Sequence, residues 1–312
     1  MRGGLTLKPS YYEALRRLTL ELAGVHVGSD HAFLVETRLA RLAREEGYAS
    51  LDAMVDELFG EGQTRLAVRV VSALVERDTH FNRDPASLDT LERFALRDLA
   101  AVRGGGRVDV LCYGCGSGQD VYSVAMRAAA LVEGGGLGGM DVRVTGVDYP
   151  SQALERAQSG RYTHFEVQRG LGARDLLRWF EAEEDGDWTV RAELRRRVEF
   201  REMHLLSGLE SLDTYHAVLF RGALGHYSAP AQVRVLRGLS RLIRQHGYLL
   251  LGTGEGLGEM HFGLDPVEGA PGLFRKREIV VPQEPVGKQP TDRRDFGPRT
   301  RRGPKRQGRA KG

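Results

Sequence analysis

Apolar residues in the first part of the chain recur at spacings of three and four, which is the period of amphipathic helices. Four such stretches follow one another, with apolar positions at Leu15, Leu18, Leu20 and Leu22; Phe33, Leu34, Leu39 and Leu42; Leu51, Met54, Val55, Leu58 and Phe59; and Leu66, Val70, Val71, Leu74 and Val75. The stretches are separated by glycines typical of helix ends and loops, at Gly24, Gly28, Gly47, Gly60 and Gly62. The pattern predicts a small helical domain over residues 1–88.

From about residue 105 the pattern changes to short apolar runs that alternate with amphipathic stretches. Strands are expected at 108–113, 142–148, 197–203, 216–222 and 247–254, and helices at 121–132, 151–160 and 232–244. Strands that alternate with helices favour an α/β domain with a mostly parallel sheet, which we place at residues 89–287. Residues 161–195 interrupt the alternation and are expected to form an inserted subdomain.

The C-terminal segment differs from the rest in charge. Residues 288–312 hold ten Lys or Arg against two Asp, a net charge of +8, so the remainder of a chain with net charge +3 carries −5. Such a polar segment buries too little apolar area to offset its conformational entropy, and we predict a disordered basic tail. We expect no nucleic-acid partner, apart from non-specific contact by this tail.

Composition excludes several classes of protein. Hydrophobic residues make up 41% and charged residues 28% of the 312 residues, which excludes a fully disordered chain and a disulfide scaffold. No apolar run reaches the ~18–20 residues that span a bilayer. The first residues lack the apolar stretch of a secretory signal. We therefore expect a cytoplasmic protein without membrane insertion.

The strongest chemical signal is the glycine run Gly114-Cys115-Gly116-Ser117-Gly118 between an expected strand and an expected helix. Glycines let a ligand approach the backbone, and the helix start offers unpaired N–H donors. A dinucleotide fingerprint would place a third glycine at position 119, which is Gln119 here. Asp148 ends the next strand, where a carboxylate accepts hydrogen bonds from a ribose diol. The combination favours S-adenosylmethionine over NAD, with a ligand-free glycine turn as the alternative.

Cys112 and Cys115 also allow a redox or metal interpretation. Two thiols without nearby His or Cys partners are too few for a structural zinc site. We predict no metal site, and we expect Cys115 to pack as a small apolar residue beneath the glycine loop.

Five segments, in order, resemble the CheR-type chemotaxis receptor methyltransferases. The family's T-x-F-F-R is similar to residues 79–83, its loop G-C-S-T-G-E-E-P-Y-S to residues 114–123, and its T-D-I-D with the following L-x-x-A-x-x-G-x-Y to residues 147–162. Residues 168–180 and 198–200 are also similar to the family. The resemblance extends to about residue 280.

The resemblance implies a Rossmann-like class I S-adenosylmethionine methyltransferase domain, an N-terminal helical domain and a small inserted β-subdomain at about 161–195. It implies methyl transfer to glutamate side chains on cytoplasmic helices of chemoreceptors or similar signalling proteins. By the same resemblance, the catalytic residues are Arg83 and His226. The implied cofactor-binding residues are Thr79, Gly114, Gly116, Gly118, Gln119, Asp148, His204, Leu205, Arg221 and Gly222.

Several positions depart from the family pattern. Gln119 stands for a glutamate, His204 for an asparagine, Gly222 for an asparagine and His226 for a tyrosine, and Arg77 also replaces an asparagine. These departures leave open a second interpretation, a catalytically weak relative that acts as a binding or scaffold protein in signalling. A third, an RNA or small-molecule methyltransferase, is favoured only by the basic tail and the glycine loop.

Three arginines in the helical domain, Arg38, Arg41 and Arg44, have helical spacing on nearly one face. The resemblance implies that such a basic helix meets acidic receptor helices. A solvated charged face, with Glu36, Glu45 and Glu46 nearby, explains the pattern equally well.

Overall fold

The computed structural model describes residues 7–28, 32–60, 62–75, 79–206 and 208–277. The chain divides into one unit of residues 1–278 and a second of residues 279–312. The fold described here is that of the first unit. The predicted disorder of residues 288–312 lies outside the described residues.

Four helices occupy the four predicted N-terminal stretches: α1 (Pro9–Ala23), α2 (Ala32–Glu45), α3 (Leu51–Leu58) and α4 (Thr64–Val75). Leu39, Met54 and Val70 are fully buried between them. The α1 helix ends at Gly24, whose left-handed backbone and N–H bond to the Leu20 carbonyl form a glycine C-cap.

Four residues expected on the buried faces are exposed instead. Phe33 is 80%, Phe59 49%, Leu34 42% and Leu20 37% exposed. Phe33 and Leu34 stand in the first turn of α2, and Phe59 lies just beyond the end of α3, so all three lie at helix ends rather than in the middle of a packed face. The helical spacing of apolar residues predicts which face of a helix is apolar, but it does not predict how far along that face the packed core extends.

A seven-stranded sheet with the order β6-β2-β1-β7-β8-β10-β9 forms the centre of the second part. Its strands are β1 (Arg107–Tyr113), β2 (Asp141–Asp148), β6 (Val198–Glu202), β7 (Tyr215–Phe220), β8 (Ile243–Leu251), β9 (Leu264–Pro266) and β10 (Leu273–Lys276). The pairs among β6, β2, β1, β7 and β8 are parallel, and β10 is antiparallel to both β8 and β9. The predicted α/β fold with a mostly parallel sheet is confirmed.

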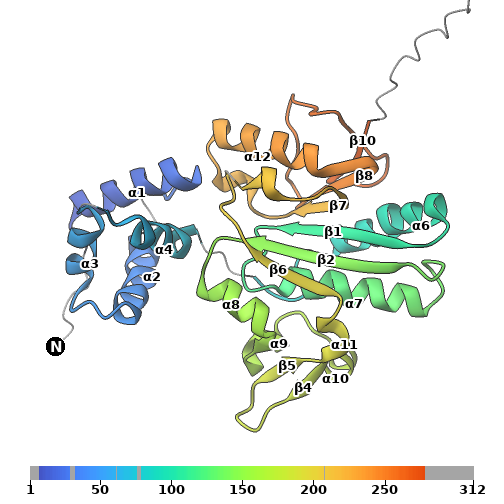
Figure 1. The fold of residues 1–312 in the computed structure, drawn as a ribbon, viewed down its shortest axis with the longest axis horizontal. Coiled ribbons are helices and arrows are strands. Elements are labelled where there is room, and N and C mark those ends of the chain that lie inside the picture. The colour runs from blue at the N-terminus through green and yellow to red at the C-terminus, as the bar shows by residue number, and fades with distance from the viewer. Residues whose placement is uncertain (1–6, 29–31, 61, 76–78, 207, 278–312) are drawn as a thin grey trace, which may run out of the picture. The chain divides into compact units, whose positions relative to one another are not determined.

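Helices cover both faces of the sheet, and Figure 1 shows α7 and α12 on opposite sides of it. One core contains Val108 and Val110 of β1 together with residues of α5 (Pro85–Thr90), a π-helical turn (Leu91–Leu96), α6 (Arg97–Arg103), α7 (Gln119–Glu133) and α8 (Gln152–Ser159). The other contains Leu111 and Tyr113 of β1 with residues of α12 (Ala229–Leu242). Alternate residues of one strand thus face two different cores.

Residues 161–195 form a small separate sheet of order β3-β5-β4, from β3 (Arg161–Tyr162), β4 (Phe180–Ala182) and β5 (Trp188–Val190). Three short helices accompany it: α9 (His164–Gln168), α10 (Ala173–Trp179) and α11 (Ala192–Arg195). The rings of Tyr162 and Phe180 pack edge-to-face on Phe81, with centroids 5.0 and 5.4 Å from its ring. The insertion is therefore fixed to the segment that carries Thr79 and Arg83.

The strand order places a topological switch beside β1. The chain runs from β1 outward to β2 and β6, and then returns to the other side of β1 as β7. In open α/β sheets, ligands bind at the carboxyl ends of the strands at such a point. A ligand site is therefore expected at the carboxyl ends of β1, β2 and β7.

His216, on β7, is a buried titratable group of this sheet. It is 3% exposed, its Nδ1 accepts a hydrogen bond from the Asp109 N–H at 2.9 Å, and Arg244 Nη1 lies 2.9 Å from its Nε2. Burial and the positive charges of Arg244 and Arg103 lower the pKa of His216 from 6.5 to about 4. The folded protein therefore takes up this proton only at a lower pH than the unfolded chain does.

We expect the free energy of unfolding to fall as the pH drops from about 6.5 to about 4, because the unfolded chain binds a proton there that folded His216 does not. A shift of this size corresponds to a loss on the order of 3 kcal/mol, fully developed near pH 4 and absent above pH 7. Urea unfolding at a series of pH values measures it. The variant His216→Gln should show a flatter profile in this window, and an unchanged slope would contradict the assignment.

Candidate active site

The glycine loop connects β1 to α7 and is held by backbone hydrogen bonds. The N–H groups of Gly114 and Cys115 both donate to the Val147 carbonyl at the end of β2, at 2.8 and 3.1 Å. Gly118 has a φ of +87°, and a Cβ there would lie 2.7 Å from the Ala157 Cβ. Glycine is therefore required at 118 by the packing of α8 beneath the loop.

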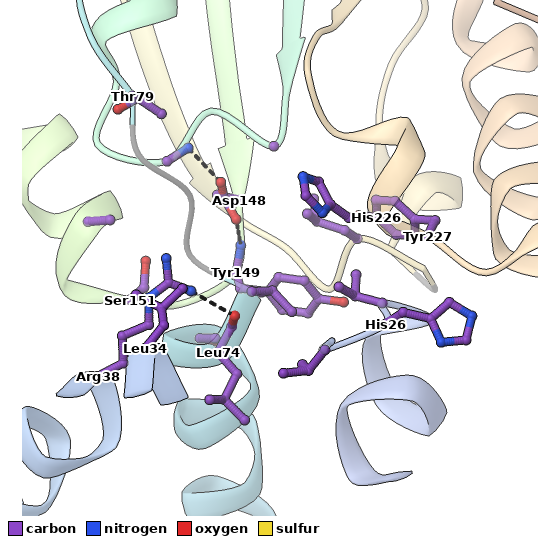
Figure 2. A pocket seen from close by; sticks show the side chains of 18 of the residues that line it. His26, Leu34, Arg38, Leu74, Thr79, Asp148, Tyr149, Ser151, His226 and Tyr227 are labelled. Carbon is purple, nitrogen blue, oxygen red and sulfur yellow. Dashed lines mark hydrogen bonds between the residues drawn. The ribbon is translucent and has the colours of Figure 1, made fainter. Parts of the chain in front are cut away.

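Asp148 joins the end of β2 to this loop. Its Oδ2 accepts the Gly116 N–H at 2.6 Å, and its Oδ1 accepts the Tyr149 N–H at 2.7 Å (Figure 2). The structure thus brings together the glycine loop and the strand-terminal acid, although they are about thirty residues apart in the sequence.

Three polar side chains form a cluster at the start of α7. The Thr79 hydroxyl donates to Gln119 Oε1, the Ser117 hydroxyl donates to the same oxygen at 2.8 Å, and the two hydroxyl oxygens are 3.0 Å apart. Gln119 is 1% exposed. It therefore supports Thr79 and Ser117 from behind rather than facing the open side of the loop.

Two arginines share one carboxylate beside the loop. Asp120 Oδ1 lies 2.7 Å from Arg221 Nη2, and its Oδ2 lies 3.2 Å from Arg83 Nη2. Arg221 also donates from Nη1 to the Arg83 carbonyl at 2.8 Å, and Arg83 donates to the Arg221 carbonyl at 2.9 Å. The Arg221 side chain is 2% exposed, and its buried Nε has no hydrogen-bond partner among the described residues.

Sequence reasoning missed Asp120. An acid in the first turn of a helix is ordinary, because it complements the helix dipole. The signal that could have identified its role was the presence of two arginines, Arg83 and Arg221, among the site residues that the resemblance implies, because two such charges in one site need an acidic partner.

Gly222 lies in the loop after β7, which is organised by Glu255. The N–H groups of residues 222–224 donate to the two oxygens of Glu255 at 2.7 to 2.8 Å, and Gly252 N–H does so at 2.8 Å. Gly222 has a φ of +63°, and a Cβ there would lie 3.0 Å from Arg83 Nη1. An asparagine at 222 tolerates this left-handed backbone but requires the Arg83 guanidinium to shift.

The segment after α1 pairs with the segment after β7. Val25 forms an antiparallel bridge with Tyr227, His26 N–H donates to the His226 carbonyl at 2.9 Å, and Ser228 N–H donates to the Gly24 carbonyl at 2.7 Å. These bonds bring residues of the helical part beside His226.

A pocket lies where these elements meet, and Figure 2 shows Asp148, Tyr149 and His226 around it. Of the residues singled out from the sequence, those that line it are Thr79, Arg83, Gly114, Gly116, Asp148, Leu205, Arg221 and His226. Those that do not line it are Gly118, Gln119, His204 and Gly222. Lining residues that the sequence analysis did not connect with this pocket include His26, Arg38, Tyr149 and Ser151.

His204 lies behind Tyr149. Its ring packs edge-to-face on the Tyr149 ring at 5.0 Å between centroids, and its buried Nδ1 has no hydrogen-bond partner among the described residues. Burial lowers the pKa of His204. His204 thus contacts the ring of Tyr149, which lines the pocket, and does not line the pocket itself.

Of the three arginines expected on one face of α2, only Arg38 reaches the pocket, where its Nη1 donates to the Leu74 carbonyl at 2.9 Å (Figure 2). Arg41 Nε lies 3.6 Å from Glu45 Oε1, and Arg44 Nε donates to the Ala40 carbonyl at 3.1 Å. Neither of these two side chains lines the pocket.

Both cysteines are free thiols in the core. Burial raises the pKa of Cys115 well above its ordinary value, so the thiol stays protonated at neutral pH. Its Sγ lies beneath the loop, 3.0 Å from where a Cβ of Gly146 would be.

None of the helices in the described ranges has the length and apolar character that a bilayer crossing needs.

Comparison with known proteins gives consistent matches. The sequence matches the family described as CheR methyltransferase, SAM binding domain, over residues 77–269. It is 31% identical over 268 residues to chemotaxis protein methyltransferase 1 of Pseudomonas aeruginosa, covering 84% of this chain and 96% of that protein. It is 28% identical over 265 residues to chemotaxis protein methyltransferase Cher2 of Pseudomonas putida, again covering 84% and 96%. The probable biofilm formation methyltransferase WspC of P. aeruginosa is 31% identical over 224 residues, which are 71% of this chain and 51% of that protein.

The lining of the pocket fits the ligand named in that family description. Glycine backbone at Gly114 and Gly116 leaves room for a close ligand, Asp148 offers carboxylate oxygens, and Arg221 offers a buried Nε donor that has no hydrogen-bond partner in the part of the chain that the structure describes. A nucleoside with an amino-acid end has hydroxyl donors that a carboxylate accepts and a carboxylate that an arginine donates to. The predicted resemblance is confirmed: the chain belongs to the CheR methyltransferase family, and its cofactor is S-adenosylmethionine.

Proposed function

We propose that the protein transfers the methyl group of S-adenosylmethionine to glutamate side chains on cytoplasmic helices of chemoreceptors or of similar signalling proteins. The observation that carries the proposal is the charge around the pocket. Arg38, Arg83 and Arg221 line it, and Asp148 is the one acid in the described lining. Behind the lining, the single carboxylate of Asp120 is shared by Arg83 and Arg221, so the three arginines still exceed the two acids. A cationic lining favours an ionised carboxylate as the group that enters. The names of the relatives, which refer to chemotaxis and biofilm formation, support a signalling substrate.

The proposed cofactor contacts follow from the groups at the end of the sheet. Asp148 accepts the hydrogen bonds of the ribose diol, and the backbone at Gly114 and Gly116 lies against the nucleoside. Arg221, with its unpartnered Nε, binds the carboxylate of the amino-acid end through a charge-assisted bond. Thr79 fixes the loop through the hydroxyl cluster that it forms with Ser117 and Gln119.

The proposed chemistry needs no general base. A glutamate with a pKa near 4.3 is already ionised at neutral pH, so its oxygen attacks without losing a proton. When bound, the cofactor would supply a methyl group activated by its positively charged sulfur; as the ester bond formed, the methyl–sulfur bond would break and its electron pair would stay on the sulfur of the leaving S-adenosylhomocysteine. The protein must hold the carboxylate in line, which is a proximity and orientation effect. Arg83, 22% exposed at the pocket, is the orienting group, and His226 faces the same space.

Radiolabelled methyl transfer to a panel of receptor cytoplasmic fragments tests the function. We expect label that alkali releases as methanol, because a glutamate methyl ester hydrolyses whereas an N-methyl group does not. Arg83→Ala should lower turnover at least tenfold, Arg83→Lys should retain part of it, and the exposed Arg93→Ala should have no effect. The assay is paired with titration of S-adenosylhomocysteine, which reports whether the cofactor site is intact.

Two results would contradict the proposal. Tight binding of S-adenosylhomocysteine with no transfer to any fragment would indicate a cofactor-binding scaffold. Alkali-stable label would indicate another acceptor atom.

A further inference from the structure

A groove of about 720 Å³ lies between α12 and the loop that follows β6, outside the active-site pocket. Its apolar wall is formed by Leu206, Leu212 and Val233. Leu209 packs onto α12 at Gly238, where a Cβ would lie 2.3 Å from Leu209 Cδ1. Glycine at 238 therefore lets the loop approach the helix closely and sets the depth of the groove.

Three arginines, Arg234, Arg237 and Arg241, line the same groove from α12. Their spacing of i, i+3 and i+7 places them on one face of the helix over about 10 Å. All three are exposed, and the structure gives them no acidic partner among the described residues. Elsewhere the protein pairs many of its surface arginines, as Arg161 with Asp185 and Asp187. Glu210 is the single acidic residue among those that line the groove in the described part of the chain.

We propose that this groove binds an acidic amphipathic helix of a partner protein. Charge complementarity selects a helix with carboxylates at i, i+3 and i+7, the same spacing as the arginines, which spans about two helical turns. The apolar wall selects a helix that presents leucine-like side chains on the adjoining face, which is the helix-in-groove mode of recognition. The hollowed shape with a leucine wall favours a helix over a flat anionic membrane.

The groove is linked to the active site by one loop. Leu206 lines the groove, whereas its neighbour Leu205 lines the pocket and accepts a hydrogen bond from the Tyr113 hydroxyl through its carbonyl. A helix seated in the groove therefore contacts the outer side of the loop whose inner side forms the pocket. It is a second contact, separate from the side chain that receives the methyl group.

Fluorescence anisotropy with the full-length protein and synthetic labelled helices tests the proposal. The probe is an 18-residue peptide with leucines along one face and glutamates at i, i+3 and i+7 beside them. We expect it to bind, at least tenfold more weakly in 200 mM than in 20 mM salt. The triple variant Arg234→Glu, Arg237→Glu, Arg241→Glu should weaken binding at least tenfold. A matched variant at three exposed arginines elsewhere, Arg93→Glu, Arg174→Glu, Arg196→Glu, should leave it unchanged.

A second variant separates the apolar contribution from the charge. Val233→Asn keeps the arginines but makes the wall polar, and it should weaken binding several-fold with little change in salt dependence. Titration of S-adenosylhomocysteine confirms that each variant is folded. Because methyl transfer is not measured, the result does not depend on the proposed enzymatic function.

Three outcomes would overturn the proposal. One is equal binding of a peptide in which lysines replace the glutamates. Another is equal loss of binding in the two triple variants. The third is the absence of peptide binding together with binding of phosphatidylserine vesicles that requires Arg234, Arg237 and Arg241, which would assign the surface to a membrane.

Discussion

The variant Asp120→Ala is expected to lose about 3–5 kcal/mol of unfolding free energy, because it leaves a buried arginine without its counter-charge. The Arg221 side chain is 2% exposed, and Asp120 is its acidic partner at 2.7 Å. Without that partner, Arg221 keeps only the carbonyls of Arg83 and Asp84, and its Nε has no partner among the described residues. Arg83 loses its ion pair in the same step.

Urea unfolding measures this loss, and two variants make it specific. Asp120→Asn keeps the shape and one acceptor oxygen, so it should cost less than the alanine variant. Asp89→Ala removes a carboxylate that pairs with Arg127 but is 60% exposed, and it should cost under about 1 kcal/mol. A loss in Asp120→Ala no larger than in Asp89→Ala would show that Arg221 does not depend on this carboxylate.

Four of the five parallel strands, β1, β2, β7 and β8, could be predicted because each contains at least four consecutive buried residues, which is the strongest local signal that a strand gives. The fifth, β6, lies at the edge of the sheet, and the alternation of Val198 and Phe200 with charged residues predicts it. The strands β9 and β10 could not, because they have three and four residues and include Pro266, Arg275 and Lys276. They pair antiparallel beyond β8, where β10 lies between β8 and β9, and β9 pairs with β10 at the edge of the sheet. Their existence depends on tertiary pairing rather than on a local pattern.

The juxtaposition of the glycine loop with Asp148 could also be predicted, since carboxyl ends of neighbouring parallel strands meet at one edge. The spacing of these residues along the sequence does not predict the direction in which each side chain points. Gln119 follows the loop directly, yet the start of α7 turns it inward, so that it lies behind Thr79 and Ser117. His204 likewise lies behind Tyr149.

No local sequence pattern predicts that the N-terminal helical domain contributes residues to the pocket. His26 follows α1 and Arg38 lies on α2, far in sequence from the glycine loop. They reach the pocket beside the place where the Val25–Tyr227 bridge and two further backbone hydrogen bonds join segments about two hundred residues apart. Periodicity predicts the helices of this part but does not show where their ends attach.

The variant Asp148→Ala is expected to weaken the binding of S-adenosylhomocysteine at least tenfold, or about 1.4 kcal/mol. The substitution removes the proposed acceptor of the ribose diol, and it also releases the N–H groups of Gly116 and Tyr149 that shape the loop. Asp148→Asn retains one acceptor oxygen, and its affinity should fall between those of the alanine variant and the parent.

Asp141→Ala is the matched control: it removes an aspartate from the opposite end of the same strand, where the side chain is 44% exposed and pairs with Arg143. Calorimetric titration of all four proteins measures the affinities. Unchanged affinity in Asp148→Ala would remove this carboxylate from the cofactor site, whereas equal losses in Asp148→Ala and Asp141→Ala would indicate a general effect on the strand.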